Sequence, residues 1–64
     1  MPFDINTIKV GDRVWGTHSD NFGFDGVIIE RRENDFYKFK IQFDHNGQEI
    51  WLGDWEIQGK YETP

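Results

Sequence analysis

The sequence predicts an all-β fold class: one small domain built as a five-stranded barrel, with a short 3₁₀ turn before the last strand. Three observations support this prediction. Short β-like runs alternate with clusters of Gly, Asn and Asp, and no window of a dozen residues keeps apolar positions at helical spacing. Aromatic residues make up 17% of the 64 residues, so large rings can supply a core although the chain has no cysteine for a disulfide.

The chain opens with a lead-in, residues 1–9, which we expect to pack on the barrel. The first strand is predicted over 13–17. Because side chains alternate along a strand, Val14 and Gly16 share one face there and Trp15 lies on the other. We expect the apolar residues of the lead-in to cover Trp15.

The second and third strands are predicted to pair with each other. The second strand runs over 24–31, and its apolar centre at 27–29 indicates cover on both faces. The third strand, over 36–43, is the clearest element because apolar and polar residues alternate along it. Its buried face is predicted to consist of Tyr37, Phe39, Ile41 and Phe43.

A hairpin and a closing strand complete the predicted barrel. Asn46 and Gly47 form a pair that tolerates positive φ, which is typical of a tight hairpin turn. The fourth strand follows over 48–52, a tight or 3₁₀ turn over 53–55, and the last strand over 56–58. Closing such a sheet into a barrel removes exposed strand edges, which matter in a small domain.

The charge balance restricts the class of partner. The net charge of −5 has the wrong sign for a protein that grips phosphates on its own, and it favours a basic or neutral partner. The lysines and arginines of the second and third strands are interleaved with acidic residues, which is typical of a mixed solvated surface. No apolar run approaches the length of a membrane span, so we expect no membrane association.

The chain also lacks the signals of secretion and of enzyme chemistry. Its first residues hold no basic leader or hydrophobic stretch, and zero cysteine suits a reducing compartment, so we expect an intracellular protein, either cytoplasmic or in the nucleus or nucleoid. There is no Cys nucleophile, no phosphate-cradling Gly loop and no catalytic Ser spacing, so we predict no enzyme and no cofactor. His18 and His45 lie in different predicted loops without a third ligand, which argues against a metal site.

Four short motifs follow one another along the chain between residues 10 and 55. Residues 10–14 hold a Gly-Asp-x-Val step, 24–28 an aromatic, a small and a β-branched residue, 41–49 a hairpin, and 52–55 a Leu-x-Asp turn. Over residues 10–57 they resemble the Tudor domains of the SH3-like barrel class, and their spacing is closest to that of Polycomb-like Tudor domains. The resemblance implies an SH3-like (Tudor-like) barrel, which with the closing strand we bound at 10–58, leaving a flexible tail over 59–64.

The same resemblance implies a binding site at the barrel end. Tudor domains that read methylated side chains hold the alkyl-ammonium in an aromatic cage. By spacing, the cage positions correspond to His18, Phe24, Phe43 and Glu49, with Asn46 as the fourth position in another register of the hairpin. Phe22 can supply a further ring, and Asp20 or Glu49 an anion. The expected partner-binding residues are therefore His18, Asp20, Phe22, Phe24, Phe43, Asn46 and Glu49.

The leading functional prediction is a non-catalytic module that binds a protein or peptide partner with Lys or Arg side chains, methylated or not. Two alternatives stay open. SH3-like barrels also occur in nucleic-acid-associated proteins, although the net charge disfavours that partner. A small acidic protein can also act as a regulator or inhibitor that covers a basic surface on another protein.

Overall fold

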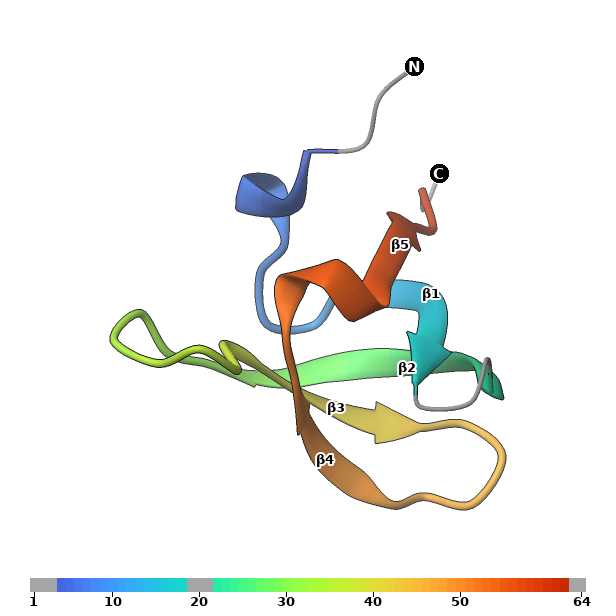
Figure 1. Cartoon of the computed structure of the whole chain (residues 1–64). Helices are drawn as coiled ribbons and strands as arrows, with labels where there is room; N and C mark the ends of the chain where they lie inside the picture. Colours follow the sequence, from blue (N-terminus) through green and yellow to red (C-terminus); the bar gives the residue numbers. More distant parts are fainter. Residues whose placement is uncertain (1–3, 19–21, 63–64) are drawn as a thin grey trace.

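The computed structural model describes residues 4–18 and 22–62, so the prediction for Asp20, and that for the lead-in where it falls on residues 1–3, lie outside the described residues. Its elements are η1 (Ile5–Thr7), β1 (Arg13–His18), β2 (Phe22–Arg31), β3 (Phe39–Phe43), β4 (Glu49–Leu52), η2 (Asp54–Glu56) and β5 (Ile57–Lys60). The strands pair antiparallel in one sheet of order β4-β3-β2-β1-β5 (Figure 1). The predicted all-β class, with five strands and a 3₁₀ turn before the last, is confirmed.

One face of the sheet carries the core. Along β3, Phe39, Ile41 and Phe43 are buried while the residues between them face outward, as the alternation predicts. Every strand contributes to a single cluster, which consists of Ile8, Val14, Phe24, Ile28, Phe39, Ile41, Phe43, Leu52 and Ile57. Burying each such side chain stabilises the fold by about 1.5–3 kcal/mol, which is how a short chain without disulfides holds together. In the described part of the chain, no helix has the length and apolar character needed to cross a membrane.

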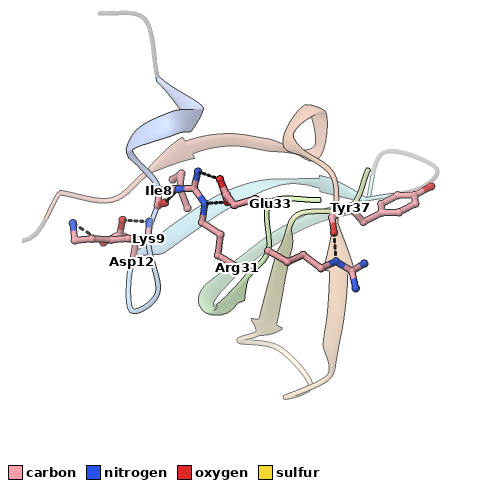
Figure 2. Close-up of polar contacts among 7 residues, drawn as sticks. Ile8, Lys9, Asp12, Arg31, Glu33 and Tyr37 are labelled. Carbon is pink, nitrogen blue, oxygen red and sulfur yellow. Dashed lines mark hydrogen bonds and ion pairs between the residues drawn. The ribbon is translucent and has the colours of Figure 1, made fainter. Parts of the chain in front are cut away.

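The lead-in is joined to the sheet by both packing and a hydrogen bond. Ile8 is fully buried in the core and Ile5 packs against it. Arg31, at the end of β2, donates from its guanidinium to the Ile8 carbonyl at 2.5 Å and also pairs with Glu33 (Figure 2). The lead-in is therefore anchored at the β2 end. Trp15, which we expected the lead-in to cover, packs on the C-terminal strand, so for the described lead-in residues that prediction was wrong.

The third strand is shorter than its alternating pattern predicts. It begins at Phe39, and Tyr37 lies in the preceding loop with an exposed side chain, so the prediction that Tyr37 faces the core was wrong. The physical reason is local hydrogen bonding. The Asp35 carboxylate accepts the Tyr37 N–H at 2.9 Å, and Arg32 donates from its side chain to the Tyr37 carbonyl. These bonds occupy the backbone groups that a strand ladder would need.

The last strand is longer than predicted. β5 runs to Lys60, beyond the predicted 56–58, and the Tyr61 N–H still donates to the Arg13 carbonyl of β1 at 2.8 Å. Gly59 looks like a strand breaker in the sequence. In the fold it pairs with Trp15, and the absence of a Cβ lets the indole ring lie directly on the β5 backbone. Residues 59 and 60 therefore belong to the sheet and not to a tail.

Candidate functional site

The β1–β2 and β3–β4 connections lie at the same end of the sheet, as an antiparallel meander requires. Rings from both connections gather there. His18 ends β1 and pairs with Phe22 at the start of β2, while Phe43 ends β3 and is followed by the turn. We call this group the ring cluster; it consists of His18, Phe22, Phe24, Phe43 and His45.

Phe43 is the centre of the ring cluster. Its centroid lies 5.1 Å from that of Phe24 and 5.4 Å from that of His45, which stacks on it at an interplanar angle of 22°. Phe22 meets both Phe43 and His45 edge-on, at 6.5 and 4.9 Å. Phe24 and Phe43 are buried, whereas Phe22 is 45% exposed. The described rings therefore pack on one another and present Phe22 to solvent as an aromatic lip.

A carboxylate fixes the His18 side of the ring cluster. His18 Nδ1 lies 2.5 Å from Oε2 of the buried Glu56, whose other oxygen accepts the Gly53 N–H at 3.1 Å. An ionised carboxylate only accepts hydrogen bonds, so Nδ1 donates in this contact. One glutamate thus holds both the imidazole and the first turn of η2, and it orients the His18 ring towards Phe43.

The predicted site residues do not all meet. The structure brings together His18, Phe22, Phe24 and Phe43. Asn46 closes the hairpin turn, where its side-chain oxygen accepts the Gln48 N–H at 2.9 Å.

Glu49 stands apart from the ring cluster. It pairs with Gln42 on the outward face of the sheet and lies 3.6 Å from the Lys40 ammonium, while Phe43 points to the core. Sequence reasoning missed His45, which it treated as a turn residue. The available signal was its position two residues after Phe43 in a tight turn, which allows the two rings to stack.

A groove of about 520 Å³ lies on the outer face of β1 and β2, beside the start of the C-terminal segment. Trp15 and Tyr61 form its aromatic part, with ring centroids 4.8 Å apart and a tilt of 55°. Its full lining is Trp15, Gly16, Gly23, Phe24, Asp25, Lys60, Tyr61 and Glu62. We call it the Trp15 groove. The sequence did not predict it because residue 61 was assigned to the tail.

Charged groups surround the tyrosine of the Trp15 groove. The Tyr61 hydroxyl donates to the Asp25 carboxylate, and the Arg13 guanidinium carbon lies 5.8 Å from the Tyr61 ring. Arg13 is itself paired with Asp44 at 2.5 Å. The hydrogen bond to Asp25, with a smaller contribution from burial, raises the pKa of the Tyr61 phenol above its ordinary value.

The raised pKa of Tyr61 predicts a pH-dependent stabilisation. The folded state favours the neutral phenol, so the contribution is fully present below the ordinary tyrosine pKa of about 10 and is lost as the pH rises through the higher folded pKa. Asp25→Asn removes the charged acceptor, and we expect the tyrosinate absorbance of the variant to develop at lower pH than in the parent. Identical titration curves for the two proteins would contradict the assigned hydrogen bond.

A third aromatic group lies at the opposite end of the β2–β3 hairpin. Phe36, Tyr37 and Trp55 are 72%, 42% and 53% exposed. Their centroids lie 4.7 to 5.5 Å apart, so the rings fill the space between one another and leave no room for a ligand within the group. We call this group the exposed triad. It joins the β2–β3 loop to η2.

Among residues 4–18 and 22–62, no three His, Asp or Glu side chains gather as metal ligands would. No family model, curated protein or solved structure matches this chain.

Proposed function

We propose that this protein is a non-catalytic binding module that recognises a protein or peptide partner carrying Lys or Arg side chains. The observation that carries the proposal is the half-exposed Phe22, seated edge-on against Phe43 and His45 where two connections meet. An exposed ring held between the buried Phe43 and the turn residue His45 offers contact area at little entropic cost, because the ring is already fixed before the partner arrives.

The chemistry of the partner follows from the rings and the net charge. Ring faces attract cations and pack against the alkyl stems of Lys and Arg. The net charge of −5 increases the rate of encounter with a basic partner and opposes binding to phosphates. We also propose that the protein acts inside the cell, since a chain without cysteine suits a reducing compartment.

The proposal includes a Tudor-like barrel as the scaffold. The buried faces of all five strands meet in one cluster, and η2 links the two edge strands β4 and β5. Both features fit a sheet that curls into a closed barrel. In such a scaffold the ring cluster occupies the barrel end, where Tudor domains carry their cage.

Titration with short peptides tests the proposal. The isotope-labelled protein is titrated with a Lys- and Arg-rich peptide, an acidic peptide and a single-stranded DNA, followed by amide and side-chain chemical shifts. We expect the basic peptide alone to bind and to shift signals of the ring cluster. Phe22→Ala should weaken binding about tenfold, or about 1.4 kcal/mol.

The matched control is Phe36→Ala, which removes an exposed phenylalanine of the exposed triad at the other end of the hairpin. We expect it to leave the affinity unchanged. Equal losses in the two variants, or no binding of the basic peptide, would contradict the proposal. DNA binding that falls log-linearly with salt would favour the nucleic-acid alternative instead.

A further inference from the structure

The Trp15 groove combines features that suit one kind of side chain. Its volume of about 520 Å³ lies within the range of roughly 300–1,000 Å³ that is usual for ligand pockets. Its floor is open at Gly23, where an added Cβ would meet no heavy atom closer than 4.0 Å. A peptide backbone can therefore approach this part of β2 closely.

The aromatic part of the groove is held rigidly. The indole ring of Trp15 lies against the Gly59 backbone on one side and contacts Tyr61 on another, and it remains 38% exposed. The hydrogen bond from the Tyr61 hydroxyl to Asp25 fixes the second ring. A planar cation that stacks on such a pre-positioned indole loses less entropy than one that must first order the ring.

The charges of the groove are predominantly negative. Asp25 and Glu62 line it, and the one cation of its lining, Lys60, lies 3.4 Å from the Asp12 carboxylate. The Tyr61 hydroxyl bonds to Oδ1 of Asp25, so Oδ2 can accept from a ligand. Two carboxylates beside an indole face match a guanidinium, which donates in a planar fork and stacks on aromatic rings.

We infer that the Trp15 groove binds an arginine side chain of an extended peptide, with the guanidinium stacked on Trp15 and donating to Asp25 and Glu62. This inference rests on the proposed function and deepens it, because it gives the basic partner a second contact. The groove and the ring cluster share Phe24 and otherwise consist of different residues, so one peptide that reaches both gains affinity from each.

The test uses the full chain and three peptides that differ at one residue: arginine, lysine or the uncharged isostere citrulline. We expect the arginine peptide to shift the Trp15 indole N–H and the Gly23 amide, the lysine peptide to do so more weakly, and the citrulline peptide not to do so. Trp15→Ala should weaken binding at least about tenfold. Glu62→Gln, an exposed change that spares the fold, should weaken it about threefold, as expected for a solvent-exposed ion pair.

Two controls separate this inference from the proposed function. Trp55→Ala removes an exposed tryptophan of the exposed triad and should leave arginine-peptide binding unchanged. Phe22→Ala should leave the Trp15 indole shift in place at saturating peptide. Shifts confined to the ring cluster, or equal binding of the citrulline peptide at the groove, would overturn the inference while the proposed function stands. Absence of shifts at both places would overturn both.

Discussion

Replacing Gly16 with alanine is expected to reduce the free energy of unfolding by about 3 kcal/mol or more. Gly16 lies on the buried face of β1, next to the point where η2 ends and β5 begins. A Cβ there would overlap the carbonyl oxygen of Glu56 and approach the Cα of Ile57 to 3.1 Å. Both neighbours are backbone atoms, which cannot rotate away as a flexible side chain can. The β1–β5 ladder would have to separate at this point.

The expected loss is large relative to the stability available. A 64-residue domain at about 0.05–0.15 kcal/mol per residue has only about 3–10 kcal/mol to lose. Displacing Glu56 would also release His18 from the ring cluster, since the two side chains are hydrogen-bonded. Urea unfolding followed by tryptophan fluorescence measures the effect. We expect Gly16→Ala to be largely unfolded or to have a strongly lowered midpoint.

Gly23→Ala is the matched control for this prediction. Gly23 lies on β2, paired with Thr17 of β1, and a Cβ added there would meet, outside its chain neighbours, no heavy atom closer than the Gly16 carbonyl oxygen at 4.0 Å. We expect a change within about 0.5 kcal/mol, as for most surface substitutions. Similar midpoints for the two alanine variants would show that the close approach of η2 to β1 is wrong.

Features of the fold that depend on residues close together in the chain could be predicted from the sequence. Alternation from Phe39 to Phe43 placed the core face of β3, and the Asn46-Gly47 pair placed the hairpin, where Gly47 has a φ of 72°. The same reasoning failed for Tyr37, which continues the alternation by type. The hydrogen bond from its N–H to Asp35 removes it from the ladder, and no periodicity reports such a bond.

The candidate sites depend on contacts between residues far apart in the chain. Phe22, Phe24 and Phe43 could be grouped because the meander brings their connections to one end. The Trp15 groove could not be predicted in this way. It forms because the Trp15 indole packs on the Gly59 backbone and because the chain continues beside β1 as far as Tyr61. A glycine followed by polar residues near a terminus is more often a chain end than a strand, so local composition favoured the wrong assignment.

Replacing Phe39 with alanine is expected to lower the free energy of unfolding by about 3–5 kcal/mol. The ring is 2% exposed and lies at the centre of the core, paired with Leu52 of β4 and with Arg31 of β2. The Arg31 guanidinium carbon also lies 5.3 Å from the ring centroid, so truncation removes a cation–π contact as well as apolar contacts. Phe39→Leu keeps most of the volume and should lose only about 1.5 kcal/mol.

Tyr37→Ala is the control variant, because the sequence pattern and the structure predict different losses of stability for it. By alternation, Tyr37 and Phe39 are equivalent core positions, and truncating either should be equally costly. In the structure Tyr37 is 42% exposed and contacts only the other rings of the exposed triad among its aromatic neighbours. We therefore expect a loss of about 1 kcal/mol, the size of an exposed aromatic pair. Urea unfolding of the three variants measures the difference. A Tyr37→Ala loss as large as that of Phe39→Ala would show that Tyr37 is a core residue of a longer third strand, and would contradict its place in the exposed triad.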